Sequence, residues 1–127
     1  MIPKFRVWDK VTQAMGVVEA IDYVDNKIYT FYRKVVRRYI PFEEAVLMQS
    51  TGLKDKNGIE IWEGDMVLTT RLIDYTYKNF KGVVKMLEGR WVIDTGTDAV
   101  YLWSEIEENE VIGNVYQNSD LIESVEE

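Results

Sequence analysis

Short runs of alternating apolar and polar residues recur along the chain, and most of them are bounded by turn residues. Phe5-Arg6-Val7-Trp8 and Ile59-Glu60-Ile61-Trp62 show the pattern most clearly. A period of two residues places successive side chains on opposite faces of a strand. The pattern predicts one long strand or a bent pair over residues 27–40, and single strands near residues 5–8, 15–21, 59–62, 66–70, 82–87, 90–94, 98–103 and 110–117.

Three glycine-containing turns separate the strands expected in the second half of the chain. Asn57-Gly58 is the strongest turn signal, because this pair tolerates positive φ and its twist matches that of two flanking strands. Gly64 predicts a second turn, and Glu88-Gly89 predicts a clean hairpin. From about residue 60 onward we therefore expect a series of short strands, several of them joined by tight turns.

Two segments break this pattern. Pro41 suits the first turn of a helix, and Glu43 and Glu44 suit the positive end of the helix dipole, so a short helix is expected near residues 41–48. The two glutamates are therefore interpreted as helix-start electrostatics and not as paired catalytic carboxylates. Residues 71–81 are expected to form a long loop, or a strand edge with a loop.

Together these elements predict a mostly β fold, either all-β or α+β. The C-terminal part would be an SH3-like small barrel, in which a curled sheet hides its edges. An additional N-terminal β region and the one short helix near 41–48 would complete it. We expect a region 1–48 ending in the helix and a barrel region 49–127, packed as one compact unit.

Composition excludes several classes of enzyme. The 127 residues include no cysteine and no histidine. The chain therefore has no disulfides, no thiolate metal sites, no cysteine nucleophiles and not the commonest general base. These absences exclude a zinc enzyme and a Ser-His-Asp hydrolase. No phosphate-binding loop is present. We expect no catalytic residues, no metal and no cofactor, and hence a protein that is not an enzyme.

The charge is unevenly distributed along the chain. The net charge is −7, but residues 1–40 carry eight Lys/Arg against four Asp/Glu, whereas residues 41–127 carry seven against eighteen. Overall acidity argues against broad non-specific binding to a polyanion. Charges near the start replace the apolar stretch of a signal peptide, and no apolar run is long enough for a membrane span. We expect a cytoplasmic protein, in the host cell, without a membrane partner.

Three segments resemble the YopX family of phage and prophage proteins. Residues 51–58 (TGLKDKNG) and 61–67 (IWEGDMV) resemble its central signature. Residues 4–10 (KFRVWDK) are similar to its opening KFRAWD, and residues 110–116 (EVIGNVY) to its closing EVIGNIYEN. The segments span nearly the whole chain in the family's order. The resemblance implies a phage or prophage origin and an architecture, but no reaction.

A basic run lies among the aromatic residues of the 27–40 segment and consists of Arg33, Lys34, Arg37 and Arg38. With Tyr29, Phe31, Tyr32 and Tyr39 it predicts a patch for a phosphate backbone with base stacking. Alternatively, the charges face water and discourage edge-to-edge aggregation, or they dock on the acidic part of this chain or of another copy.

Acidic and tryptophan residues give further candidates. Glu60, Glu63 and Asp65 suggest a hard-cation site, but turn chemistry explains them better. We expect Glu105, Glu107, Glu108 and Glu110 to form an acidic surface that mimics nucleic acid or meets a basic partner, or else a simple solvated turn. We expect Trp62, Trp91 and Trp103 to occupy core or barrel-mouth positions. The alternative is that they are exposed and form a groove for a peptide.

The sequence therefore favours a non-enzymatic module that binds a protein partner or itself as a homo-oligomer. Nucleic-acid binding by residues 29–39 is the alternative. The candidate interaction surface comprises Arg33, Lys34, Arg37, Arg38, Tyr39, Trp62, Glu105, Glu107 and Glu108.

Overall fold

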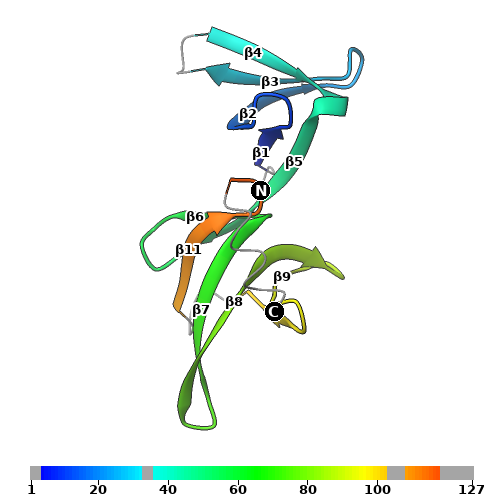
Figure 1. Ribbon diagram of the computed structural model, residues 1–127. Helices are drawn as coiled ribbons and strands as arrows, with labels where there is room; N and C mark the ends of the chain where they lie inside the picture. The colour runs from blue at the N-terminus through cyan, green and yellow to red at the C-terminus, as the bar shows by residue number, and fades with distance from the viewer. Residues whose placement is uncertain (1–3, 33–35, 103–107, 118–127) are drawn as a thin grey trace. The chain divides into compact units, whose positions relative to one another are not determined.

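The structure is a computed structural model that describes residues 4–32, 36–102 and 108–117 (Figure 1). The chain divides into two compact units, unit 1 (Met1–Ser50) and unit 2 (Thr51–Glu127). The strands of both units pair antiparallel, and a single turn of 3-10 helix interrupts them within the described ranges. The prediction of a mostly β chain is confirmed.

Unit 1 is one curled antiparallel sheet with the strand order β4-β3-β2-β1-β5. Its strands are β1 (Phe5–Asp9), β2 (Ala14–Asp22), β3 (Lys27–Tyr32), β4 (Val36–Pro41) and the first six residues of β5 (Ala45–Lys54). A register shift between Val18 and Ala20 interrupts the β2–β3 ladder. Such a bulge increases the local twist. The curled sheet buries Val7, Ile28 and Ile40 together, with Val18, Phe42 and Ala45 packed against them.

The helix expected near residues 41–48 is wrong beyond its first turn. Only Phe42–Glu44 is helical, as a 3-10 turn, and β5 begins at Ala45. Residues 45–49 pair with β1, with Val46 opposite Trp8. This ladder satisfies the backbone groups and buries Met48. Non-local strand pairing therefore outweighs the local helix signals.

The described part of unit 2 contains the end of β5 and six further strands. β6 is hydrogen-bonded to β5, and the other five strands form a sheet in the order β10-β9-β8-β7-β11. The strands are β6 (Glu60–Trp62), β7 (Asp65–Ile73), β8 (Thr76–Leu87), β9 (Arg90–Asp94), β10 (Ala99–Tyr101) and β11 (Glu108–Asn114). They enclose a core of Ile61, Val67, Val84, Ile93 and Leu102.

The described strands of unit 2 do not close into a barrel. β10 and β11 are the two edges of the five-stranded sheet, and neither forms a ladder with β6. The closed SH3-like barrel of the sequence analysis is therefore not found. The expected turns are present, with Gly58 and Gly64 at positive φ and a two-residue turn at Glu88-Gly89.

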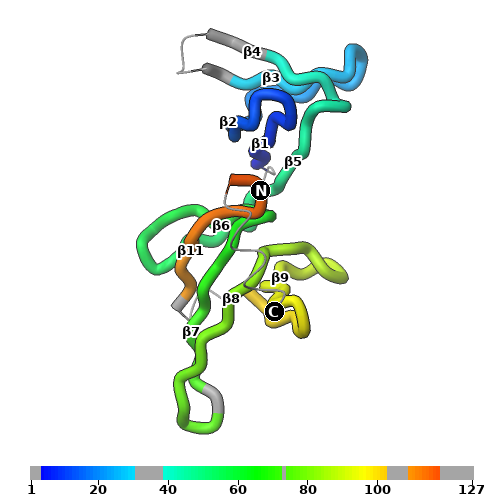
Figure 2. The backbone as a smooth tube through the Cα atoms, viewed as in Figure 1, coloured from blue at the N-terminus to red at the C-terminus, as the bar shows by residue number. Residues whose placement is uncertain are grey.

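Residues 71–81 do not form the expected long loop; they are strand apart from the two-residue turn at Asp74-Tyr75. They belong to a long hairpin in which β7 and β8 pair continuously from Met66–Val83 to Ile73–Thr76 (Figure 2). β11 pairs with β7 only as far as Thr70, and β9 pairs with β8 only from Val83. Within the described residues, the last part of the hairpin therefore pairs with no third strand.

None of the described segments forms a helix with the length and apolarity that a membrane crossing needs.

Candidate functional site

The turn between β5 and β6 is organised by one carboxylate. Asp55 Oδ1 accepts hydrogen bonds from the backbone N–H groups of Asn57 at 2.8 Å and Ile59 at 2.9 Å. The Asp55 N–H donates to the Ile59 carbonyl at 2.7 Å, and Gly58 takes a φ of +79°. A short polar side chain that bonds to the backbone ahead of it is a common way to fix a turn.

The second oxygen of Asp55 reaches a distant strand. Asp55 Oδ2 accepts a hydrogen bond from the Val111 N–H in β11 at 3.0 Å. Beside it, the Lys56 N–H donates to the Asn109 carbonyl at 2.9 Å, and Lys56 Nζ lies 3.1 Å from Glu110 Oε2. We call the Asp55 carboxylate and its three backbone donors the Asp55 clamp. The clamp binds the turn between β5 and β6 to β11.

The electrostatics of the clamp favour the ionised carboxyl group. Asp55 is only 7% exposed, and this burial by itself would raise its pKa. The N–H groups of Val111, Ile59 and Asn57, with a smaller contribution from the Lys56 charge, outweigh burial and lower the pKa below 3.8. The clamp is therefore a charge-assisted structural contact.

The next turn uses a second buried carboxylate. Asp65 Oδ2 accepts a hydrogen bond from the Trp62 N–H at 2.8 Å, and Asp65 is 2% exposed. The Gly64 N–H donates to the Val84 carbonyl, and its own carbonyl accepts from Val115. Within residues 4–32, 36–102 and 108–117, no three acidic side chains gather where they could hold a metal ion. Asp65 therefore serves the turn.

At the end of β11, an asparagine closes the last described turn in the same way. Asn114 Oδ1 accepts hydrogen bonds from the N–H groups of Tyr116 at 3.0 Å and Gln117 at 2.8 Å. The amide of Asn114 donates to Gln117 Oε1 at 2.6 Å. Asp55, Asp65 and Asn114 thus all act through backbone contacts that shape unit 2.

These polar residues lie in the segments that mark a known protein family. The family model described as YopX protein matches residues 4–123. The chain belongs to the YopX family. Two solved structures have a similar fold, protein EF1440 from Enterococcus faecalis and YopX from Bacillus subtilis. The first has 26% identity and a TM-score of 0.59, covering 96% of this chain and 99% of that chain. The second has 23% identity and a TM-score of 0.64, covering 93% and 94%. No curated protein sequence matches.

The YopX signature therefore has a structural explanation in this chain. Its central and closing segments, residues 51–67 and 110–116, meet at the Asp55 clamp. Its opening segment forms β1, which is paired with a strand on each side in unit 1. None of these contacts requires a substrate or a ligand. The residues that identify the family are thus poor guides to the surface that acts.

A better candidate is the far end of the β7–β8 hairpin. Leu72 and Tyr77 are cross-strand partners, and they are 60% and 75% exposed. Tyr75, in the turn between them, is 100% exposed. We call residues 72–77 the hairpin tip. It presents one aliphatic and two aromatic side chains to solvent within six residues.

The backbone of the hairpin tip is unusual for its sequence. Asp74 and Tyr75 have φ values of +52° and +64°. The paired positive angles form a tight hairpin turn that Asn-Gly or Asp-Gly usually provides. A bulky residue in this conformation is an outlier, and backbone strain of this kind clusters at functional sites. Tyr75 has no burial to offset that cost.

Basic residues lie next to the hairpin tip. Arg71 and Lys78 are paired directly across the two strands. The Arg71 guanidinium donates a hydrogen bond to the Tyr101 carbonyl, whereas the Lys78 side chain is exposed. The tip therefore combines apolar contact area with positive charge in an otherwise acidic unit.

Unit 1 carries a second aromatic group, a half-buried and an exposed tyrosine on the outer face of the β3–β4 hairpin. Tyr29 and Tyr39 are cross-strand partners whose ring centroids lie 6.4 Å apart, edge to face. Lys27 Nζ lies 4.4 Å from the centroid of the Tyr39 ring. Ile28 and Ile40, on the opposite face, are buried in the core. The structure thus joins Tyr39, a predicted site residue, with Lys27, which the sequence analysis did not select.

The other predicted site residues within the described ranges lie on three different strands. Arg37 and Arg38 lie in β4, where they pair with Phe31 and Thr30. Glu108 begins β11 opposite Thr70, and Trp62 is half-buried at the end of β6. Outside the described residues lie Arg33, Lys34, Glu105, Glu107 and Trp103.

The sequence analysis missed the hairpin tip because the turn lacks glycine. Tyr75-Thr76-Tyr77 has strong β propensity and follows Asp74, a common turn residue. That combination, with Leu72 on the preceding strand, was the available signal. The positive φ of Tyr75 could not be read from residue preferences, because such preferences disfavour it.

Proposed function

We propose that this protein is a phage- or prophage-encoded, non-enzymatic protein-interaction module of the host cytoplasm. Its contact element is the hairpin tip. The partner is a folded protein that offers an apolar patch bordered by acidic groups. The observation that carries this proposal is Tyr75, which is fully exposed on a left-handed backbone between exposed Leu72 and Tyr77.

The chemistry of the tip is that of an interface hot spot. Tyrosine is enriched at such sites, because its ring gives a large contact area at a small cost in conformational entropy. The two-residue turn and continuous ladder hold the three apolar side chains on a narrow, pre-organised ribbon. Arg71 and Lys78 flank this ribbon, so an acidic border on the partner complements it and speeds association.

A site-specific photo-crosslinker at position 75 tests the proposal in host cells. Tyr75 is replaced by p-benzoylphenylalanine, and the same residue at Tyr23, which is 76% exposed in unit 1, is the matched control. We expect a discrete heterologous adduct from position 75 that is lost when Leu72→Ser and Tyr77→Ser are added. Equal labelling from both positions would contradict the proposal. An adduct with the mass of two copies would show that the hairpin tip contacts a second copy of this chain and not a different protein.

A second candidate function is supported by the outer face of the β3–β4 hairpin. There Lys27 and Tyr29, both half-buried, and the exposed Tyr39 form a basic and aromatic group. The strand pairing continues to Phe31 and Arg37. Aromatic rings beside cations can stack bases and contact phosphates of single-stranded nucleic acid. This candidate has less support because the acidic chain opposes polyanions and because Lys27 already lies over the Tyr39 ring.

Fluorescence anisotropy with labelled single-stranded DNA and RNA tests this second candidate at several salt concentrations. If it holds, binding weakens with salt and is lost in the Arg37→Glu/Arg38→Glu variant and in Tyr39→Ala. Lys10→Glu, an exposed charge change in the same unit, should retain more of the binding. Equal losses in all variants would indicate only a general charge effect.

A further inference from the structure

Unit 2 has an open hollow at a place where its two sets of strands are not joined. The hollow has a volume of about 370 Å³ and is lined by Leu53, Arg90, Trp91, Tyr101 and Leu102. Leu53 comes from the end of β5, and the others come from β9 and the edge strand β10 with the residue after it. Its size is at the low end of the roughly 300–1,000 Å³ of small-ligand sites.

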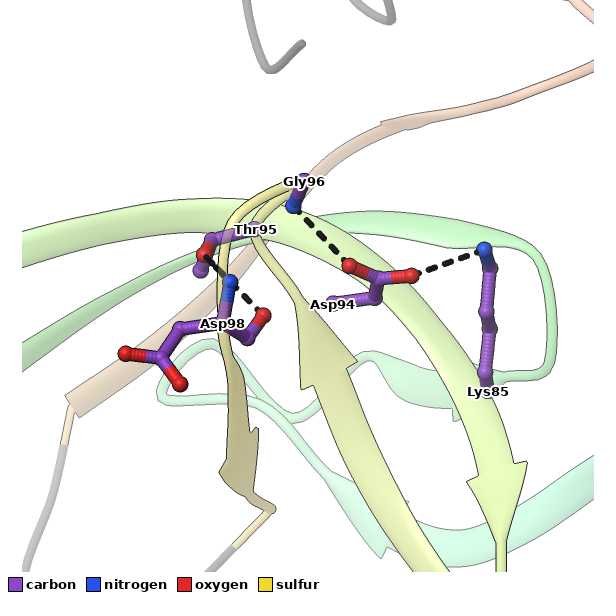
Figure 3. A network of polar contacts seen from close by, with 5 residues as sticks. All are labelled: Lys85, Asp94, Thr95, Gly96 and Asp98. Atoms are coloured by element: carbon purple, nitrogen blue, oxygen red, sulfur yellow. Dashed lines mark hydrogen bonds and ion pairs between the residues drawn. The ribbon is translucent and has the colours of Figure 1, made fainter.

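The β9–β10 hairpin, which supplies lining residues at its open end, is braced by its turn at the other end. Figure 3 shows the Asp94 carboxylate between the Gly96 N–H and the Lys85 ammonium group, each at 2.9 Å. The Lys85 hydrogen bond, aided by that of Gly96, lowers the pKa of Asp94 below its ordinary value. Thr95 and Asp98 close the turn by mutual hydrogen bonds. The hollow is therefore built on a braced hairpin.

The same hairpin sets the positions of the lining residues. Tyr101 is the cross-strand partner of Val92, and the Leu102 N–H donates to the Trp91 carbonyl at 3.0 Å. Leu102 is 8% exposed and joins the unit 2 core, against which Leu53 and Trp91 also pack. The floor of the hollow is therefore the edge of the unit 2 hydrophobic core.

Positive charge is concentrated at this hollow. The Arg90 guanidinium carbon lies 5.1 Å from the centroid of the Tyr101 ring, and the Arg71 guanidinium binds the Tyr101 carbonyl. Residues 51–127 contain only seven Lys/Arg against sixteen Asp/Glu, so two cations at one tyrosine stand out. Within the described part of the chain, Arg90 forms no ion pair. A cation stacked on a ring is held in place and keeps its N–H donors for a carboxylate.

We propose that this hollow binds the C-terminal residue of a partner polypeptide whose last side chain is apolar. Leu53, Trp91 and Leu102 receive that side chain, and Arg90 receives the terminal carboxylate. A terminal residue places its carboxylate beside its own side chain, as an apolar floor with a cationic rim requires. In an extended peptide, an acidic residue next to an apolar one would point to the opposite face. The proposal goes beyond the hairpin tip and concerns a separate surface.

Short synthetic peptides test the site directly. The probe is N-acetyl-Gly-Gly-Phe with a free carboxylate, and binding is followed by amide chemical shifts of the full chain in NMR. We expect saturable shifts at residues 90–92 and 101–102. The C-terminal amide of the same peptide, and N-acetyl-Gly-Gly-Gly carboxylate, should each bind at least tenfold more weakly.

Variants connect the binding to the named residues. Arg90→Gln changes an exposed side chain, and it should weaken the carboxylate peptide about tenfold while leaving the weak binding of the amide unchanged. Lys54→Gln, an exposed charge change next to Leu53, is the matched control and should bind like the wild type. Equal affinity for amide and carboxylate, or unchanged affinity in Arg90→Gln, would overturn the proposal.

Binding of N-acetyl-Gly-Gly-Phe-Asp at the affinity of the first probe would show an internal acidic motif in place of a chain terminus, and would also overturn it. Crosslinking from position 75 should be unaffected by Arg90→Gln. A failure of the hollow and a failure of the hairpin tip are therefore distinguishable.

Discussion

Two turns of unit 2 are built from similar kinds of residue but have opposite roles. The turn after Asp55 contains the family signature, and its carboxylate receives three backbone hydrogen bonds, one of them from β11. The turn at Asp74 and Tyr75 has two positive φ values and an entirely exposed tyrosine. The first turn directs its polar atoms inward to hold the fold. The second directs apolar atoms outward at a conformational cost.

The difference shows where a recognisable signature does and does not point. Residues that fix turns are confined to a few types, because only short carboxylates, amides and glycine suit the geometry. A contact surface has no comparable constraint and leaves no motif. The comparison makes four predictions, ordered from the largest expected effect to the smallest.

Removing the clamp should have the largest effect on stability. Asp55→Ala deprives three backbone N–H groups of their acceptor, and we expect the free energy of unfolding to fall by about 3 kcal/mol. Urea denaturation followed by tryptophan fluorescence measures it. Asp74→Ala, a change of the same type in the exposed turn, should cost far less. Equal losses would mean that the two turns are not different in kind.

Close packing at the base of the hairpin gives the next effect. A Cβ atom added at Gly82 would lie 2.4 Å from the Asp94 carbonyl oxygen, so Gly82→Ala should destabilise the protein by about 2 kcal/mol. Gly58→Ala is the matched control, because no atom lies within 4 Å of the added carbon. Its φ of +79° leaves only backbone strain, about 1 kcal/mol. A larger loss at Gly58 would contradict the structure.

Acid should weaken the clamp without removing the side chain. The folded-state pKa of Asp55 is lowered from 3.8, so its contribution is complete well above pH 3.8 and is lost as the pH falls below that value. Urea midpoints between pH 2.5 and 7 should decline more for the wild type than for Asp55→Asn. Asp98→Asn, at an exposed carboxylate, should follow the wild type. Parallel curves for wild type and Asp55→Asn would refute this assignment.

The smallest effect should have the opposite sign. Tyr75→Gly relieves a left-handed tyrosine and should raise the unfolding free energy by about 0.5 kcal/mol. The same variant should lose the proposed partner contact. Tyr77→Ser, on the regular strand, provides the comparison because it removes an exposed ring without relieving a turn. A destabilised Tyr75→Gly would show that the ring contributes to folding.

Much of the fold could be predicted from local patterns, and the exceptions share a cause. The alternation around Val7, Ile61 and Val92 gave the strands, and Gly58 and Gly89 gave turns. The helix expected at Pro41 failed because pairing with β1 is a non-local contact that no short window contains. The open barrel could not be predicted either, since it depends on which edges meet.

The candidate sites were harder to predict than the fold. Tyr39 was selected from its neighbours in sequence, but its partner Lys27 becomes apparent only when β3 and β4 are paired. The hairpin tip and Arg90 were missed because exposure is a property of the folded surface. Residue type alone does not distinguish Tyr75 from a tyrosine in the core.

The bond from Asp55 to Val111 joins residues that are 56 positions apart. A ribosome that has released Asp55 and its turn must add β7 to β10 before the donor from β11 exists. Until then, the Asp55 carboxylate stays hydrated, and the earlier strands of unit 2 lack their contact with β11. Folding of unit 2 should therefore wait until β11 has been synthesised. Fragments that end before β11 should remain protease-sensitive.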